Sequence, residues 1–302
     1  MISIIIPTYN RASLLSTTLP SYLEQKKVSE IIIVDDLSTD NTSDVISQYI
    51  ECNKNKHIQI RYIKHPCHKG AASARLTGII EAKNQYIVFG EDDVIFDRNY
   101  ISILHDDMEK THADIIAGRI IYLKDNESYE SGIKRYNELK LPIIDYRTLE
   151  GHFGVNVPKP VEVPFVHACF LAKKEVFSNI KYDTNFAGNG YREETDPQIS
   201  ALEVGKKIVY TPNTYCYHLP RSVAGTGGQW TMNALWYSYW VIKNNIYFLK
   251  KHYSFLSQKY NLEPYSFMLL HIILFSLKNM VIQIYSRAKS IITHNATKLP
   301  MF

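Results

Sequence analysis

Short apolar runs alternate with longer amphipathic stretches over the first hundred residues. Four runs rich in β-branched residues end in turn-forming residues, the pattern of buried parallel strands; they cover residues 2–6, 30–34, 58–64 and 85–89. Helices are predicted over residues 11–25, 39–50 and 71–82. Strands that alternate with helices favour an α/β fold with a Rossmann-like, mostly parallel sheet flanked by helices. Ligands of such folds bind at the carboxyl ends of the strands.

The next hundred residues continue this pattern less regularly. A helix is predicted over 100–111, a short helix from 173 to 177, and strands over 114–122, 163–172, 207–211 and 215–218. Residues 123–160 contain several glycines and prolines and read as a long irregular excursion, a kind of loop that often carries function. Asp196 followed by Pro197 predicts the start of a helix that runs to Val204, because Asp caps helices and proline suits the first turn.

The C-terminal part has a different texture, with aromatic and aliphatic residues among lysines in two helical stretches, 232–253 and 263–290. The apolar run 268–277 is short and contains His271, whereas a membrane-spanning helix needs about 20 residues. This length argues against a span. The helices are expected to lie on a membrane surface, or to pack as a hairpin on the domain or on a sister subunit.

Charge is unevenly distributed, although the net charge is only +4. Residues 204–302 contain eleven lysines and arginines against one acidic residue, Glu263, so their net charge is +10 and that of residues 1–203 is −6. This split suggests that the C-terminal part faces membrane phosphate, nucleic acid or an acidic glycan. An ordinary solvated basic face is the alternative.

Other features narrow the class of protein. A hydrophobic content of 45% and a charged content of 21% fit a soluble globular protein. The four cysteines form no CxxC pair, which gives no support to a zinc ribbon or a redox motif. The opening MISIIIPTYN has neither a basic region nor an apolar stretch long enough for secretion, so a cytoplasmic location is expected.

Acidic residues end two of the predicted strands, where a nucleotide-binding protein often has glycines. Neither GxGxxG nor GxxxxGK[ST] follows the first strand, which weighs against a dehydrogenase or a P-loop enzyme. Asp35 and Asp36 follow the second strand, and a carboxylate there can accept a hydrogen bond from a uracil N–H or a ribose hydroxyl. Glu91, Asp92 and Asp93 follow the fourth strand, and a bound hard cation would relieve their mutual repulsion. A solvated acidic turn is the alternative for either cluster.

Four segments in sequence order carry a family resemblance: SIIIPTYNR, EIIIVDDLSTDNT, HKGAASAR and VFGEDDVIF. Over residues 1–225 the chain resembles the family-2 glycosyltransferases with the GT-A fold. The resemblance implies that Pro7, Tyr9 and Asp36 hold the nucleoside, while Arg75 supports the base or diphosphate side of the pocket. Glu91-Asp92-Asp93 then takes the place of the DxD motif. Its first acid would contact the ribose, and Asp93 would ligate a metal ion; Glu91 stands where the family has Asp.

The later segment GNGYREETDPQIS resembles the ED motif of this family. The resemblance makes Glu194 the general base, at a position where Asp is more common, and Asp196 a supporting group near a helix N-terminus. Acids are also frequent in the first turn of any helix. His218 stands ahead of a Gly-Gly loop, as a metal-binding histidine does in related sequences; a packed or surface histidine is the alternative. Glycines 225, 227 and 228 would let that loop close over the diphosphate.

The resemblance therefore predicts an inverting glycosyltransferase of the hexosyltransferase type that uses Mn²⁺ or Mg²⁺. A nucleoside-diphosphate sugar, with UDP favoured, would donate to a glycan or lipid-linked acceptor during synthesis of a surface polysaccharide, glycolipid or glycoprotein glycan. The predicted domains are a GT-A catalytic domain over 1–228, divided into a nucleotide-binding half (1–115) and an acceptor half (116–228), and a helical C-terminal extension over 229–302.

Two competing interpretations remain at the level of sequence. A nucleotidyltransferase also uses paired acids on Mg²⁺, but it would be expected to carry a glycine-rich, basic signature near the first strand. A non-catalytic module that binds carbohydrate or nucleic acid is supported only by the basic, aromatic C-terminus, and no nucleic-acid partner is predicted for the enzyme. The enzyme is expected in the cytoplasm, or at the cytoplasmic face of a membrane to which residues 232–302 dock unless they form a homodimer.

Overall fold

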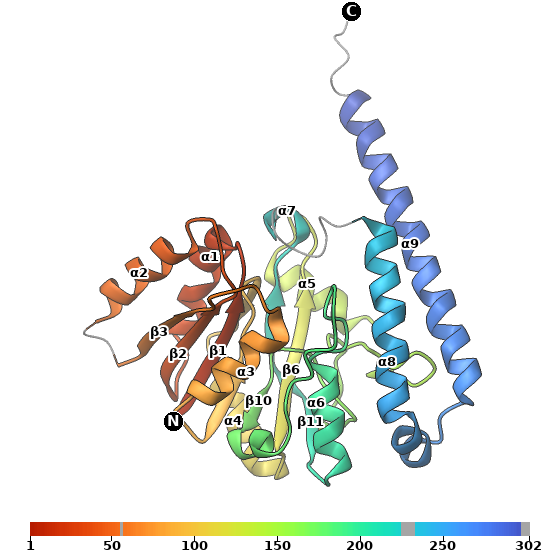
Figure 1. Cartoon of the computed structure of the whole chain (residues 1–302), viewed down its shortest axis with the longest axis horizontal. Coiled ribbons are helices and arrows are strands. Elements are labelled where there is room, and N and C mark those ends of the chain that lie inside the picture. The colour runs from red at the N-terminus through yellow and green to blue at the C-terminus, as the bar shows by residue number, and fades with distance from the viewer. Residues whose placement is uncertain (55–56, 225–232, 297–302) are drawn as a thin grey trace, which may run out of the picture.

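The computed structural model describes residues 1–54, 57–224 and 233–296 of the 302-residue chain (Figure 1). Within these residues the centre is a nine-stranded sheet with the strand order β3-β2-β1-β4-β10-β6-β11-β5, and β9 pairs with β11. Helices flank the sheet, and two long helices, α8 and α9, stand beside it at the C-terminal end (Figure 1). The predicted α/β class with a mostly parallel sheet and a helical C-terminal part is confirmed.

The first half of the sheet follows the sequence prediction closely. Four strands are parallel: β1 (Ile2–Thr8), β2 (Val28–Asp35), β3 (Gln59–Lys64) and β4 (Tyr86–Phe89). The helices between them are α1 (Ala12–Leu23), α2 (Thr42–Asn53) and α3 (Ala71–Glu81). Helix α3 lies close on β1 because Gly78 has no side chain; a Cβ there would stand 2.2 Å from Cγ2 of Ile5.

The second half begins with β5 (Val94–Phe96), α4 (Tyr100–Thr111), β6 (Ile115–Tyr122), α5 (Tyr129–Asn137), β7 (Ile144–Asp145) and β8 (Glu150–Gly151). It continues with β9 (Val161–Glu162), β10 (Leu171–Lys173), the 3-10 helix η1 (Lys174–Ser178), α6 (Thr195–Glu203), β11 (Ile208–His218) and α7 (Arg221–Ala224). Strand β10 is antiparallel to both β4 and β6, and β11 is parallel to β6. The carboxyl ends of β1, β2, β4, β6 and β11 therefore meet at one edge of the sheet.

Four predictions about elements were wrong in detail. The excursion 123–160 contains helix α5, whose start is capped by Ser128, because its hydroxyl accepts a hydrogen bond from the Ser131 N–H. Of the predicted strand 163–172, only residues 171 and 172 belong to a strand, β10; at Val166 the Gln198 side chain, rather than a strand, bonds both the backbone N–H and the carbonyl.

The two predicted strands after residue 206 are the single strand β11, whose register with β6 shifts between Tyr210 and Tyr215. The N-cap position of α6 is Glu194 and not Asp196, which lies inside the helix. The helix therefore starts two residues before the position that the proline signal suggested.

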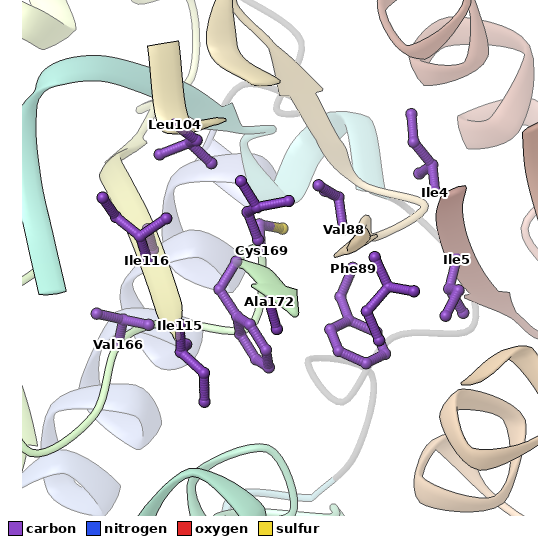
Figure 2. Packing of buried hydrophobic residues seen from close by; sticks show 14 of the residues in the cluster. Ile4, Ile5, Val88, Phe89, Leu104, Ile115, Ile116, Val166, Cys169 and Ala172 are labelled. Atoms are coloured by element: carbon purple, nitrogen blue, oxygen red, sulfur yellow. The ribbon is translucent and has the colours of Figure 1, made fainter. Parts of the chain in front are cut away.

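A continuous apolar core joins the two halves. Figure 2 shows Ile4 and Ile5 of β1 near Val88 and Phe89 of β4, with Ile115 and Ile116 of β6 farther along the sheet. Cys169 is buried in this core, and the chain's four cysteines are free. Close packing of this kind fixes strand ends in space, so the residues that follow the strands are held in a defined arrangement.

The C-terminal helices are α8 (Ala234–Tyr260) and α9 (Tyr265–Ala296), both longer than predicted. Helix α8 buries one face against the rest of the protein, including Val241, Phe248 and Leu256, and α9 packs along α8. The sequence argument about length was wrong. The helix from Tyr265 to Tyr285 is long and apolar enough to cross a membrane by length and composition, with a mean hydropathy of 1.8.

Candidate active site

Asp93 and His218 meet at the carboxyl edge of the sheet. Strands β5 and β11 pair so that His218 lies opposite Val94, and the Leu219 N–H donates to the Asp93 carbonyl over 2.9 Å. This pairing leaves Nε2 of His218 3.7 Å from Oδ1 of Asp93. The sequence predicted both residues as metal ligands, and the fold brings them together although 125 positions separate them in the chain.

The ring of His218 presents the nitrogen that a metal would need. Its Nδ1 lies 2.9 Å from the Leu219 carbonyl, which can only accept, so in the neutral ring the proton is on Nδ1 and the lone pair on Nε2. Metal–ligand bonds to nitrogen and carboxylate oxygen are about 2.0–2.2 Å long, so two atoms 3.7 Å apart can bind one ion. Among the described residues no group of three His, Cys, Asp or Glu side chains could hold a metal. A magnesium-type site with few protein ligands and substrate phosphates fits these two residues.

The acidic loop after β4 is fixed by residues that the sequence did not single out. The Tyr22 hydroxyl accepts from the Glu91 N–H over 3.1 Å and lies 2.8 Å from the Glu91 carbonyl. Gly90 allows this approach, because a Cβ there would stand 2.9 Å from the Tyr22 ring. Thr8 donates its hydroxyl proton to Asp92 over 2.9 Å. Removal from water, and then the charge of Asp93, raises the pKa of Asp92 well above its ordinary value.

Asp36 anchors the loop that leads into α3. Its carboxylate lies 2.8 Å from Nδ1 of His65 and accepts from the backbone N–H groups of Lys69 (2.8 Å) and Gly70 (2.7 Å). Nδ1 of His68 lies 2.8 Å from Oδ2 of Asp36, the oxygen that also accepts from Gly70. Burial raises the pKa of Asp36, but these hydrogen bonds and the nearby His68 outweigh it, so the pKa lies below its usual value.

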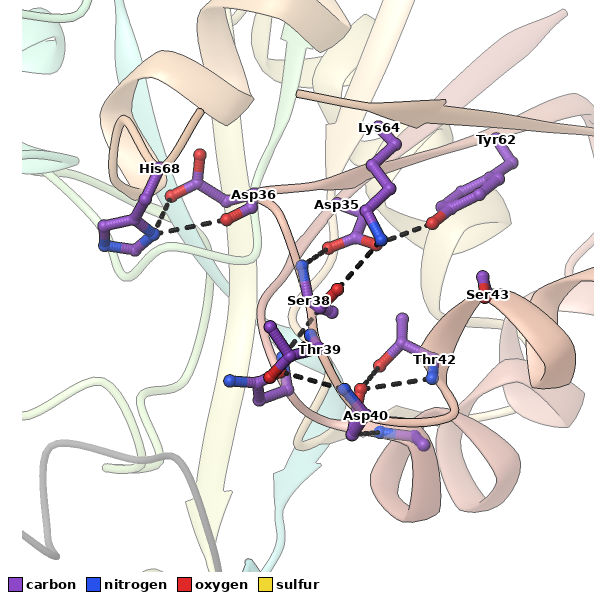
Figure 3. Close-up of polar contacts among 12 residues, drawn as sticks. Asp35, Asp36, Ser38, Thr39, Asp40, Thr42, Ser43, Tyr62, Lys64 and His68 are labelled. Atoms are coloured by element: carbon purple, nitrogen blue, oxygen red, sulfur yellow. Dashed lines mark hydrogen bonds and ion pairs between the residues drawn. The ribbon is translucent and has the colours of Figure 1, made fainter. Parts of the chain in front are cut away.

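The partners of Asp36 leave little room for a nucleoside base. Four donors match the roughly four acceptor positions of a carboxylate, and Figure 3 shows His68 seated against Asp36. The His68 side chain is 58% exposed and its ring lies 4.6 Å from that of Tyr9, which is also exposed. His68 is therefore the partner that an incoming base could displace. Pro7, two residues before Tyr9, pairs in register with Val34.

Asp35, the neighbour of Asp36, has a different environment. It is fully buried and accepts from the Tyr62 hydroxyl over 2.6 Å and from the Ser38 N–H over 2.7 Å (Figure 3). Lys64 donates to the Ser38 carbonyl over 2.8 Å. Asp35 thus shapes the turn after β2, while Asp36 faces the loop before α3.

Arg75 joins the acidic loop to the segment before α6. Its guanidinium lies 3.2 Å from Glu91 and 3.4 Å from Glu193, and all but a few percent of its surface is buried. Nη1 of Arg75 and Oε2 of Glu193 have no hydrogen-bond partner among the described residues. Burial raises the pKa of Glu193 to about 7 against the opposing charge of Arg75. Buried polar atoms are normally satisfied, so these two mark a place for a polar ligand.

Glu194 follows directly, at the N-cap position of α6. Its side chain is half-buried and forms no ion pair or side-chain hydrogen bond with another described side chain. Burial raises its pKa, and its carboxylate interacts electrostatically with Arg75 and Glu91. A carboxylate with a raised pKa and no structural partner is suited to accept a proton from a ligand.

Asp196 faces the C-terminal helices instead. It is 1% exposed and lies 2.6 Å from Nζ of Lys251 and 2.8 Å from Nε2 of His252. The other ring nitrogen of His252 lies 2.9 Å from Glu203. Asp196 therefore ties α6 to α8, and the structure places it among stabilising contacts rather than beside Arg75 and Glu91.

We expect Asp196→Ala to lower the free energy of unfolding by about 3–5 kcal/mol, because it removes the partner of the buried Nε2 of His252 and a partner of Lys251. Urea denaturation checks this. Asp106→Ala is the control, since its ion pair with Lys27 is exposed and worth about 0–1 kcal/mol. Unchanged stability combined with lost turnover would instead assign Asp196 to the chemistry.

Helix α8 also braces the segment before Glu194. Arg192 has a left-handed backbone (φ 73°) and is buried. Its guanidinium donates to Asn245 of α8 over 2.9 Å and to the Leu149 carbonyl over 2.7 Å. The residues next to Glu194 are thus held between α8 and the β7–β8 hairpin. No sequence motif pointed to Arg192 in this role.

The fold and the site together define a class of enzyme. A mostly parallel sheet gathers acidic residues and a histidine at its carboxyl edge, and the carboxylate of Glu194 interacts electrostatically with Glu91 of that edge. This arrangement suits group transfer from a donor that carries a nucleotide and phosphates.

Comparison with known proteins gives the family. Residues 3–181 match the model of glycosyl transferase family 2. Glycosyltransferase GlyG of Streptococcus pneumoniae serotype 4 is 31% identical over 224 residues, which are 72% of this chain and 70% of that protein. The chain therefore belongs to family 2 and is a glycosyltransferase. Neither a nucleotidyltransferase nor a non-catalytic module accounts for this match.

Other similar proteins match shorter segments or only the fold. An Escherichia coli UDP-Glc:alpha-D-GlcNAc-diphosphoundecaprenol beta-1,3-glucosyltransferase, WfaP, is 44% identical over 94 residues, 31% of this chain and 35% of that protein. The structure of Staphylococcus aureus TarS 1–349 in complex with UDP superposes with a TM-score of 0.54 at 15% identity, over 85% of this chain and 73% of that one. GalNAc-T7 with UDP, GalNAc and Mn²⁺ gives 0.63 at 18% identity, over 95% and 57%. At such identities the likeness shows the fold, which is the GT-A fold expected from the sequence.

Proposed function

We propose that the enzyme transfers a hexosyl group from a UDP-sugar to an acceptor hydroxyl, with inversion and with a divalent metal ion, during synthesis of a surface polysaccharide or glycolipid. One observation carries the proposal: Asp93 and Nε2 of His218 converge at the carboxyl edge of the sheet, and Glu194 stands free on the segment that Arg75 links to that edge. The donor and the lipid-linked acceptor in the name of the WfaP relative, and the UDP in the TarS structure, support the substrate classes.

The donor side of the site is assigned from the predicted residues. Pro7 and Tyr9 would contact the nucleoside, and Asp36 would accept a hydrogen bond from the base once His68 leaves its carboxylate. Glu91 would contact the ribose, with Asp92 beside it. Arg75 stays between Glu91 and Glu193, where its unpartnered nitrogen can donate to the donor.

Chemistry at the anomeric carbon then depends on a single displacement. Asp93 and His218 would hold a divalent ion, Mn²⁺ or Mg²⁺, which when bound would supply Lewis-acid stabilisation of the departing diphosphate. Glu194 accepts the proton of the acceptor hydroxyl as that oxygen attacks from the face opposite the leaving group. One displacement of this kind inverts the anomeric configuration, by the same geometry as in inverting glycosidases.

The proposed enzyme has two domains. Residues 1–228 would form the catalytic domain and residues 229–302 an extension. The boundary falls within residues 225–232, which lie outside the described residues. The glycines that are predicted to close over the diphosphate lie in the same segment. The contacts of α8 with Asp196 and Arg192 support the view that the extension also holds the acceptor half in place. The enzyme would work at the cytoplasmic face of a membrane.

A donor screen tests the proposal. We expect metal-dependent release of UDP from one or more UDP-sugars, measured with Mn²⁺, with Mg²⁺ and with a chelator, and at least about a hundredfold loss in the chelator because the Lewis acid contributes several kcal/mol. Analysis of the anomeric configuration of the transferred sugar by NMR distinguishes inversion from retention. Metal-independent turnover or a retained configuration would contradict the corresponding part of the proposal.

A further inference from the structure

Helix α9 exposes an apolar surface along most of its described length. Five of its large apolar side chains are more than half exposed: Phe267, Leu274, Val281, Ile282 and Tyr285. Surface hydrophobic residues are normally scattered singly, whereas a continuous apolar surface marks an interaction site. These five extend over five turns of one helix.

The protein itself covers only a narrow stripe of α9. Met268, Ile272 and Ser276, spaced four residues apart, are buried, as expected for one helical face that packs on α8. Only 17% of the apolar segment is buried inside the protein. Between Tyr265 and Tyr285 the only Lys, Arg, Asp or Glu is Lys278. A helix that is apolar on nearly all sides normally lies in a protein core or in lipid, and α9 is not in the core.

The surrounding charge identifies the occupant. Exposed lysines lie on both helices: Lys243, Lys250 and Lys259 on α8, and Lys278 on α9. Residues 204–302 carry a net charge of +10. A second copy docked through α9 would bring an equal positive charge against this one, whereas anionic lipid headgroups would neutralise it.

We propose that the exposed faces of α9 enter the hydrocarbon and headgroup region of an anionic lipid bilayer, while its stripe at Met268, Ile272 and Ser276 stays on α8. In Figure 1, α9 continues past the start of α8 on the side of α7, which follows the carboxyl end of β11. Helix α9 therefore runs toward the side of the protein on which the active-site edge lies. If the proposed function holds, a lipid-linked acceptor then reaches the site without leaving the membrane.

Vesicle flotation with the full-length protein tests this. We expect the protein to float with vesicles of phosphatidylcholine and phosphatidylglycerol, and more weakly with phosphatidylcholine alone. The triple variant Leu274→Ser, Val281→Ser, Ile282→Ser should bind at least about tenfold more weakly, because it removes apolar side chains that the bilayer buries. Lys278→Gln should weaken binding to the anionic vesicles about fivefold.

The matched control is the double variant Ile80→Ser, Val204→Ser, which removes two apolar side chains of similar exposure, 69% and 66%, on α3 and after α6. It should float like the wild type. Donor hydrolysis in solution should be the same in all of these variants, which separates failure of this proposal from failure of the proposed function. Vesicle binding that the triple variant retains, or an absence of binding together with a stable dimer in light scattering that the triple variant dissociates, would overturn the proposal.

Discussion

Glu194→Gln should lower kcat by about 10²–10⁴-fold, the usual contribution of a general base, and leave the affinity for UDP with metal nearly unchanged. The amide keeps the size of the side chain but cannot take the proton of the acceptor. Glu194 has no structural partner among the described side chains, so the fold should survive the change. Steady-state kinetics and calorimetry with UDP separate the two effects, because loss of a base appears in kcat and not in donor binding.

The pH dependence of the wild type gives an independent signature. A base must be ionised to act, so kcat should rise with pH through the pKa of Glu194. Burial raises that pKa above its ordinary value, and the acid limb should therefore lie above the range of an exposed glutamate. Glu175→Gln, a surface change at a side chain that is 68% exposed, should leave the kcat profile unaltered. A fully active Glu194→Gln enzyme would remove Glu194 from the role of base.

Much of the fold could be predicted because local pattern and tertiary packing agree there. The four parallel strands of the first half are almost wholly buried, and buried strands appear in the sequence as unbroken β-branched runs. Prediction failed where a side chain replaced a strand neighbour. Residues 163–170 are as apolar as a strand, but at Val166 Gln198, 32 positions away, supplies the hydrogen bonds, and nothing in the local pattern indicates this.

The candidate site also has features that the sequence could predict and features that it could not. Positions at the ends of strands, such as Asp36 and Asp93, could be predicted because the parallel sheet brings those ends to one edge. The contacts that orient them could not, since Tyr22 reaches the acidic loop from α1 and Arg192 reaches Asn245 across 53 positions. The resemblance to the ED motif placed Asp196 near the chemistry, but two residues along a helix turn a side chain by about 200°, and Asp196 contacts α8 instead.

The second large effect is expected at the pair Asp93 and His218. Asp93→Asn should weaken binding of UDP in the presence of Mn²⁺ by at least about 100-fold, and His218→Ala should weaken it as well, because each change removes one of the two protein ligands proposed for the ion. Without metal, both variants should bind UDP as weakly as the wild type does. The comparison isolates the metal contribution from any direct contact with the nucleotide.

Calorimetry with UDP in Mn²⁺ and in chelator measures these affinities, and Mn²⁺ titration followed by electron paramagnetic resonance measures the ion directly. Asp44→Asn is the control, since it makes the same chemical change at an exposed position in the first turn of α2. Equal metal-dependent affinity in Asp93→Asn and the wild type would show that the ion binds elsewhere. If Asp93→Asn loses the metal-dependent affinity for UDP and His218→Ala keeps it, the Asp93 carboxylate is the sole ligand of the pair. The contact of His218 with the Leu219 carbonyl would then serve only to hold the end of β11.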